Sequence, residues 1–188
     1  MKIVSNLLGI GVMFCFLVAC SQSQPQAVHR ENGWYYVLGE NQDSLSREPI
    51  VTVKEFAEVH LDSDTSGVYV ITGVVSKHKQ QDWADATERA VGKHIAFVFN
   101  DSIVSSPQVN QRIESGNFQI SIPRERNSDI PTIFRQLCKE KIDTIDSLFH
   151  DWETDSTYTS QEQDSMKMEI DYWEAKMLLE SFSNPELH

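Results

Sequence analysis

The sequence predicts an α+β fold, in which a small sheet with one packed helix is followed by a C-terminal α-helical hairpin. Short β-branched and aromatic runs bounded by turn residues fill the middle of the chain and are typical of strands. Residues 79–91 place apolar side chains at the spacing of one helix face and precede a strand hairpin. The last third carries two longer apolar stripes at helical spacing. A helix next to a strand hairpin implies packed layers of the two.

Residues 1–19 have the parts of a lipoprotein signal peptide. A single basic residue, Lys2, precedes an apolar run at 7–19 that is short for a membrane-spanning helix. The run ends at Cys20, and Leu17 to Cys20 resembles a lipobox, in which the cysteine is acylated, for example with palmitate, and becomes the first mature residue. The alternatives are an ordinary signal peptide or an uncleaved anchor. We expect a lipid-anchored protein of the cell envelope that faces the periplasm, or the outer side, of the cytoplasmic or outer membrane.

Residues 20–32 are polar and without periodicity, which predicts a flexible tether after the lipidated Cys20. The net charge of the chain is −12, which argues against nucleic acid and anionic lipid surfaces as partners. Membrane contact is therefore expected through the lipid alone. Because Cys15 would leave with the signal peptide and Cys20 would be acylated, Cys138 has no partner for an intramolecular disulfide.

Residues 33–126 form the predicted α+β domain. Its helix is expected at 79–91 and ends before Gly92, a residue that adopts the left-handed conformation at little cost. Asn100 and Asp101 also tolerate positive φ and predict a tight hairpin between two strands. The predicted strands are 34–38, 50–53, 68–76, 95–99, 103–105 and 117–122.

A family resemblance appears within this domain, closest over residues 84–120 and weaker back to Gly33. The residues that carry it, in order, are Thr87, Gly92, Lys93, Ala96, Val98, Ile103 to Pro107, Ile113, Gly116 and Ile120. In this order and spacing they resemble the head subdomain of the first periplasmic domain of SecD and SecDF, membrane subunits of the bacterial protein export machinery. The chain departs from the family pattern in having Asn100-Asp101 at the hairpin tip, where the family usually has Asp-Gly, and Ser121 in place of Gly.

The resemblance implies a binding role in export or folding. In that family the head contacts the emerging polypeptide and swings between two positions, driven by proton flow through transmembrane helices. Beyond the signal this chain has no apolar run of about 18 residues, so we expect no motor of its own. The expected partners are unfolded or translocating polypeptides or translocon subunits, and the candidate binding residues are Trp83, Asn100, Asp101 and Pro107. The alternatives are a structural or assembly lipoprotein that docks one fixed partner and a hydrolase-like enzyme.

Residues 127–188 form the predicted helical hairpin. The first stripe includes Phe134, Cys138, Ile142, Ile145, Phe149 and Trp152, and the second includes Met166, Ile170, Trp173, Met177 and Leu178. Thr159 and Glu162 have the spacing of a capping box at the start of the second helix. From Asp129 to His188 there are 14 acidic and five basic residues, either a solvated outer face or an acidic surface for a basic partner.

The link between these helices has the oxygen-ligand spacing of an EF-hand loop. Its candidate calcium ligands are Asp151, Glu153, Asp155, Thr157, Thr159 and Glu162. Ser156 stands where the loop needs Gly, so we favour a capped turn and expect no metal or other cofactor.

Catalytic motifs do not emerge from the sequence. It contains no Gly-x-Ser-x-Gly elbow, no His-Glu-x-x-His and no Cys-x-x-Cys, and its six histidines have no ligand spacing. Cys138 lies one helical turn from both Phe134 and Ile142, which favours a small buried hydrophobe over a catalytic nucleophile. We therefore expect a protein that is not an enzyme.

Overall fold

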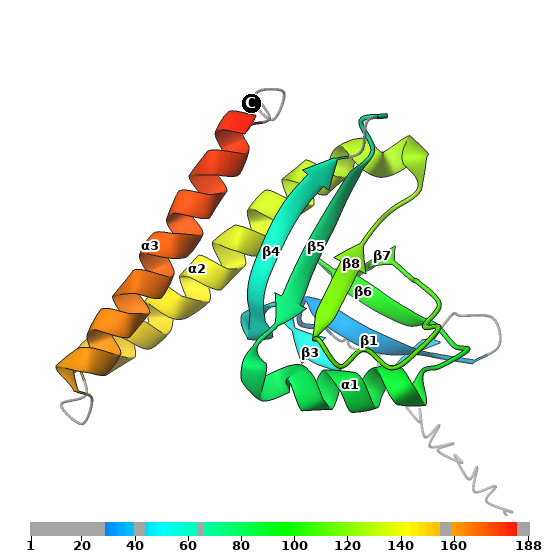
Figure 1. The fold of residues 1–188 in the computed structure, drawn as a ribbon, viewed down its shortest axis with the longest axis horizontal. Coiled ribbons are helices and arrows are strands. Elements are labelled where there is room, and N and C mark those ends of the chain that lie inside the picture. Colours follow the sequence, from blue (N-terminus) through cyan, green and yellow to red (C-terminus); the bar gives the residue numbers. More distant parts are fainter. Residues whose placement is uncertain (1–28, 40–43, 64–65, 155–158, 184–188) are drawn as a thin grey trace, which may run out of the picture.

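The computed structural model describes residues 29–39, 44–63, 66–154 and 159–183, and Figure 1 shows their arrangement. Two antiparallel sheets pack against each other, helix α1 (Gln80–Arg89) closes one end, and the long helices α2 (Ile130–Thr154) and α3 (Ser160–Ser183) extend to the other side. The α+β class that the sequence predicts is confirmed. Within these described residues, no helix is both long enough and apolar enough to cross a membrane.

The first sheet has the strand order β2-β1-β6-β7, and β3 also pairs with β1. Trp34 in β1 lies opposite Phe97 in β6, so the two central strands place aromatic side chains next to each other. A Cβ atom at Gly33 would meet the carbonyl oxygen of Val51, which is why only glycine allows β3 to approach β1 there. The strands are β1 (Gly33–Leu38), β2 (Ser44–Leu45), β3 (Val51–Thr52), β6 (Ile95–Phe99) and β7 (Ser102–Ser105).

The predicted hairpin between β6 and β7 is confirmed. Asn100 and Asp101 have φ angles of 49° and 59°, the left-handed conformation that a two-residue hairpin turn requires. These residue types adopt it more readily than other non-glycine residues because their short side chains bond locally. The departure from Asp-Gly at this tip therefore leaves the turn intact.

The second sheet has the order β4-β5-β8 and contains a strand that the sequence patterns did not indicate. Strand β4 (Phe56–Ser63) pairs with β5 (Tyr69–Val75), and β8 (Asn117–Ile120) completes the sheet. A bulge between Phe56 and Glu58 shifts the register, so the buried side chains of β4 are Phe56 and Val59. This spacing of three hides the two-residue alternation by which a strand is recognised.

The core lies between the sheets. Phe56 and Phe118 from the second sheet pack with ring centroids 4.4 Å apart, and Trp34 and Phe97 from the first sheet meet at 5.4 Å. Trp83 of α1 reaches Trp34 at 5.8 Å and is 1% exposed. Helix α1 is shorter than predicted, because Lys79 belongs to a 3-10 turn η2 (Lys77–Lys79) and the helix ends at Arg89, two residues before the predicted end.

Helix α2 packs along the sheets and joins their core. It follows a 3-10 segment η3 (Arg124–Asp129), runs beside β4, β5 and the 3-10 turn η1 (Val53–Glu55), and buries Ile130, Phe134 and Leu137. Helix α3 runs back along α2 (Figure 1), with Met166 and Trp173 in the interface, and its last third approaches β4. The predicted helical hairpin is therefore present. The expected inward position of Leu178 is wrong, because that side chain is 55% exposed.

Candidate functional site

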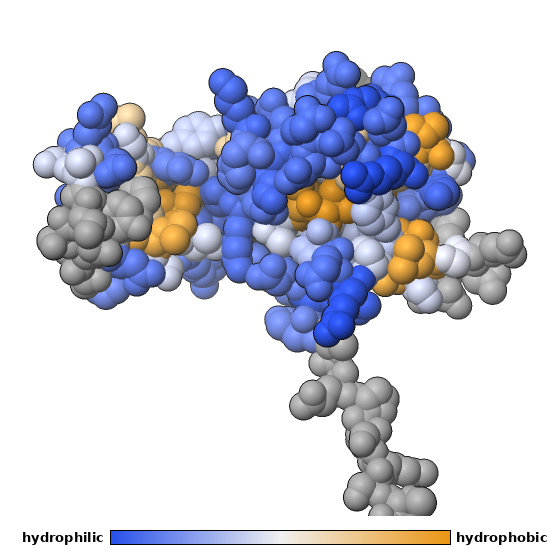
Figure 2. All heavy atoms as spheres, turned by 90° about the horizontal axis from the view of Figure 1, so that it is seen from below, coloured by the Kyte–Doolittle hydropathy of each residue, from blue (hydrophilic) through white to orange (hydrophobic). Residues whose placement is uncertain are grey.

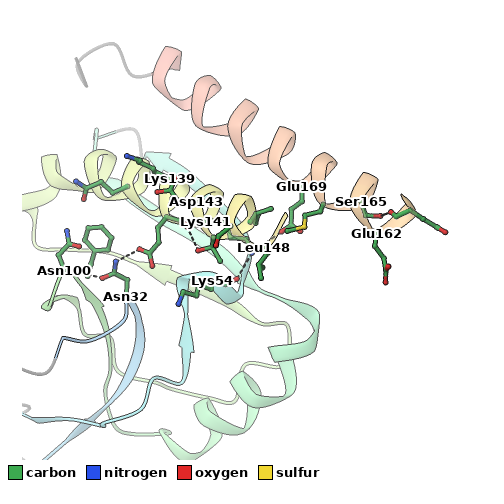
Figure 3. Close-up of a pocket in the computed structure, with 18 of the residues that line it drawn as sticks. Asn32, Lys54, Asn100, Lys139, Lys141, Asp143, Leu148, Glu162, Ser165 and Glu169 are labelled. Carbon is green, nitrogen blue, oxygen red and sulfur yellow. Dashed lines mark hydrogen bonds and ion pairs between the residues drawn. The ribbon is translucent and has the colours of Figure 1, made fainter. Parts of the chain in front are cut away.

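A groove of about 1330 Å³ opens between the helical hairpin and the sheets (Figure 3). One wall is the middle of α2, the second is the first turns of α3, and the third consists of Asn32, Lys54, Phe99 and Asn100 at the edge of the first sheet. We call it the hairpin groove. The helical side chains in it that matter below are Glu140, Lys141, Ile145, Leu148, Glu162, Met166 and Glu169.

One side of the hairpin groove is held by the Asn32 side chain. Its Oδ1 accepts a hydrogen bond of 2.7 Å from the backbone N–H of Asn100, and its Nδ2 donates one of 2.6 Å to Glu140 Oε2. A primary amide is suited to this role because it donates and accepts at once. Asn32 thus ties the β6–β7 tip to α2, as Figure 3 shows, and sets the spacing of two groove walls.

Two lysines link the walls further. Lys141 Nζ donates to the Lys54 carbonyl at 2.9 Å and lies 3.5 Å from Glu169 Oε1 on α3, although Lys141 is only 7% exposed. Lys54 Nζ pairs with Glu31 at 2.6 Å, and this hydrogen bond raises the pKa of Lys54. Both ammonium groups are therefore neutralised within the protein and brace the groove.

The groove also has an apolar strip. Ile145 and Met166 are buried at its base, while Leu148 is 49% exposed. Figure 2 shows hydrophobic surface beside the tip of the α2–α3 hairpin. A polar margin around an apolar strip suits a polypeptide segment, because such a segment brings both backbone amides and apolar side chains.

The structure separates the four candidate binding residues. Asn100 lines the groove. Asp101 beside it accepts from the Arg30 backbone N–H at 2.7 Å and contacts His29 Nδ1 at 2.8 Å; these bonds, the first foremost, lower the Asp101 pKa. Pro107 is exposed after β7, outside the groove, and its carbonyl accepts from Ile95 N–H.

Trp83 has a place in the core. Its indole N–H donates to the Asn117 carbonyl at 3.2 Å, and its ring is buried against Trp34. We therefore assign its side chain to packing. Its large size, which drew attention in the sequence, is equally typical of a core residue.

The candidate calcium ligands lie in different parts of the chain. Asp151 and Glu153 lie within α2, whereas Asp155 and Thr157 fall outside the described residues. The Glu162 carboxylate accepts from the Thr159 backbone N–H at 2.8 Å and its hydroxyl at 2.9 Å, and these bonds lower the Glu162 pKa. The described residues contain no group of three His, Cys, Asp or Glu side chains that could hold a metal ion. The capping box is confirmed, and the expectation of a capped turn without calcium stays a prediction.

Of the two cysteines expected in the mature chain, the structure describes Cys138. Cys138 is fully buried, and burial raises the pKa of its thiol to about 12, so it is protonated at neutral pH and is a poor nucleophile. Cys20, the expected lipid attachment site, lies outside the described residues.

Sequence patterns missed most of the groove. Asn32 was assigned to the tether, and Lys54 and Leu148 attracted no attention. Asn32 and Glu140 are 108 positions apart, so only the folded chain shows that they meet. The one usable signal in the sequence was Leu148, an apolar residue that lies next to the predicted apolar stripe of α2 but outside it.

A family model described as "SecDF, P1 head subdomain" matches residues 32–128, which is more than half of the chain. The chain belongs to this family. The resemblance found in the sequence is thereby confirmed, and we refer to residues 32–128 as the SecDF head. The hairpin groove lies where this head meets α2 and α3, helices that lie outside the matched residues.

Two curated relatives are similar to this chain. The protein translocase subunit SecD of Rhodothermus marinus is 30% identical over 103 residues, which are 54% of this chain and 16% of the relative. The protein translocase subunit SecD of Acidaminococcus fermentans is 31% identical over 72 residues, 38% of this chain and 17% of the relative. The chain thus spans about a sixth of the length of these relatives.

Solved SecDF structures are also similar to part of the chain. One, described as a membrane component SecDF that enhances protein export, gives a TM-score of 0.45 at 17% identity and covers 56% of this chain and 62% of that chain. A second, SecDF in a super-membrane-facing form, gives 0.43 at 16% identity and covers 54% of this chain and 18% of that chain.

Proposed function

We propose that this protein is a lipid-anchored accessory of bacterial protein export that holds polypeptide segments in the hairpin groove. The observation that carries the proposal is the membership of residues 32–128 in the SecDF P1 head family. The curated relatives are named as protein translocase subunits, and we take the polypeptide ligand of the proposal from that name. In our proposal the SecDF head binds polypeptides without proton-driven movement of its own.

The groove supports this role by its size and chemistry. At about 1330 Å³ it exceeds the range of roughly 300–1,000 Å³ typical of small-molecule pockets, which favours part of a polymer as ligand. Leu148 offers an exposed apolar contact, while Lys54 and Lys141 are already paired with acidic residues. We propose weak, sequence-tolerant binding, because backbone amides and apolar side chains are common to all polypeptides.

The proposal places the protein on a membrane through Cys20. Growth with radiolabelled palmitate should label the wild-type chain, and the Cys20→Ala variant should lose both the label and its membrane association. Label retained in Cys20→Ala would contradict the anchor. It would leave the groove proposal open to its own test.

Photocrosslinking in cells tests the groove directly. A photoreactive phenylalanine analogue replaces Leu148, and the control replaces Leu38, which is exposed to the same degree at 48% but lies on β1 away from the groove. We expect crosslinks from position 148 to several exported polypeptides, and few from position 38. Crosslinks to one protein only would identify a docking lipoprotein instead. Equal labelling from both positions would contradict the groove as the site.

A further inference from the structure

Helix α3 is apolar on two faces, although it packs through only one. Its inner face buries Met166 and Trp173 against α2. On the opposite side Met168 is 68% exposed, Tyr172 46% and Leu179 67%. A helix that covers one side of a hairpin needs a single apolar face, so the second one calls for a different explanation.

The exposed side chains form a continuous stripe. Met168, Tyr172, Ala175 and Leu179 follow one another at the spacing i, i+4, i+7 and i+11, which keeps them within about 60° around the helix axis. The stripe is about 16 Å long, or three helical turns. We call this stripe the outer α3 face. α2 lies between the first turns of α3 and the head (Figure 1). The last third of α3 approaches β4 at Lys176, whose ammonium lies 5.7 Å from the Tyr172 ring, and Met168 and Leu179 are the most exposed large side chains of the stripe. Exposed apolar patches of this kind mark interaction surfaces.

Acidic residues border the outer α3 face. Asp164 and Asp171 lie at its margin, and α3 as a whole carries six acidic and only two basic residues. Lys176 is buried beside β4, and Lys167 forms an exposed pair with Asp171 at 3.7 Å, which a competing cation can replace. The surface around the apolar stripe is therefore negative.

We propose that the outer α3 face binds a positively charged amphipathic helix of a partner polypeptide. Such a helix would lay its apolar side on Met168, Tyr172 and Leu179 and place lysines or arginines opposite Asp164 and Asp171. Methionine suits this contact because its flexible side chain adapts to different partners. The proposal concerns a surface separate from the hairpin groove and does not depend on it.

Charge also decides between this partner and two others. A second copy of the chain would bring its own net charge of −12 to an acidic surface, and like charges oppose that association. A bacterial membrane surface with anionic headgroups would be repelled for the same reason. A basic helix is the occupant that both the apolar stripe and its acidic border favour.

Fluorescence anisotropy with the purified full chain tests the proposal. The probe is a labelled synthetic peptide of about 14 residues, with leucines along one face and lysines on the other, and its counterpart carries glutamates in place of the lysines. We expect saturable binding of the cationic peptide that weakens as salt is added, and little binding of the anionic one. Equal binding of the two peptides, or none of the cationic one, would overturn the proposal.

Two variants locate the binding. Met168→Ser/Leu179→Ser should weaken cationic peptide binding at least tenfold, and Asp164→Asn/Asp171→Asn, which leaves the apolar stripe intact, should weaken it severalfold. The control Leu38→Ser removes an exposed apolar side chain from the head, 48% exposed against 68% for Met168 and 67% for Leu179, and should change nothing. Unchanged affinity in both α3 variants would overturn the proposal. The proposal would also be overturned if the wild type formed a dimer that Met168→Ser/Leu179→Ser abolishes. The same holds if the wild type bound anionic vesicles and this variant did not.

Discussion

Lys176 Nζ lies 3.2 Å from His60 Nδ1, a contact that joins the last third of α3 to strand β4 of the SecDF head. Lys176 is only 9% exposed, and its ammonium lies 5.7 Å and 5.9 Å from the ring centroids of Tyr172 and Trp173. This contact adds to two others that fix the helical hairpin to the head, the hydrogen bond between Asn32 and Glu140 and the one from Lys141 to the Lys54 carbonyl. These contacts fix the position of the α2–α3 hairpin, which forms two walls of the hairpin groove.

The buried ammonium predicts a pH dependence of stability. Burial lowers the pKa of Lys176 below 10.5, and this outweighs the opposite effect of Cys138, Glu58, Glu180 and Asp62, in that order. Between the folded-state pKa and 10.5 the unfolded chain binds more protons, so stability rises with pH across this window. The unfolding free energy of the wild type, relative to Lys176→Met, should therefore increase between neutral pH and about pH 10 in urea titrations. A constant or falling difference would contradict the assignment.

The Asn32 bridge should contribute measurably to stability. Asn32→Ala removes two hydrogen bonds and should cost about 1–3 kcal/mol in urea unfolding. Asn32→Asp should cost more, because a carboxylate would face Glu140 instead of donating to it. Asn110→Ala, at an exposed asparagine, is the control and should stay within about 0.5 kcal/mol of the wild type. Similar losses of unfolding free energy in Asn32→Ala and Asn110→Ala would show that the Asn32 bridge does not stabilise the fold.

Trp83 should behave as a core residue. Trp83→Ala should lower the unfolding free energy by about 3–5 kcal/mol, while Leu38→Ala at an exposed position should change it by less than about 0.5 kcal/mol. Urea unfolding followed by circular dichroism measures both. If Trp83→Ala were nearly neutral in stability but impaired binding of polypeptides, the residue would belong to a site and not to the core.

Glu162 separates the capping box from the calcium hypothesis. Its hydrogen bonds to Thr159 lower the Glu162 pKa, so the stability they provide is present above 4.5 and is lost as the pH falls through the folded-state value. Glu162→Gln should therefore destabilise the chain at neutral pH and match the wild type in acid. We expect no calcium-dependent difference between the two by thermal unfolding. Stabilisation of the wild type alone by millimolar calcium would establish the metal site.

Local patterns allowed much of the fold to be predicted. The Asn100-Asp101 turn, the two stripes of the helical hairpin and the Thr159–Glu162 capping box depend on neighbours within one turn or one helix. Strand β4 was missed because the bulge at Phe56 and Glu58 breaks its two-residue period. The alternation of apolar and polar residues does not reveal a β-bulge of this kind.

The groove could not be predicted in this way. Its walls come together through contacts between distant positions, such as Lys54 with Lys141 and Asn32 with Glu140. The position of α3 also made Leu148 and Met166 parts of one site, although Met166 was predicted only as part of an interior stripe and Leu148 belonged to no predicted stripe. Of the four residues first proposed for binding, Asn100 alone lines the groove.

Binding of unfolded polypeptides to matched variants tests the central claim most directly. The affinities of three unrelated, permanently unfolded polypeptides are measured for the wild type, Leu148→Asp and Leu38→Asp by fluorescence anisotropy. The account predicts that the wild type and Leu38→Asp bind all three weakly and alike, and that Leu148→Asp loses at least tenfold in affinity for each. Wild-type affinity in Leu148→Asp for all three polypeptides would contradict the hairpin groove as the binding site.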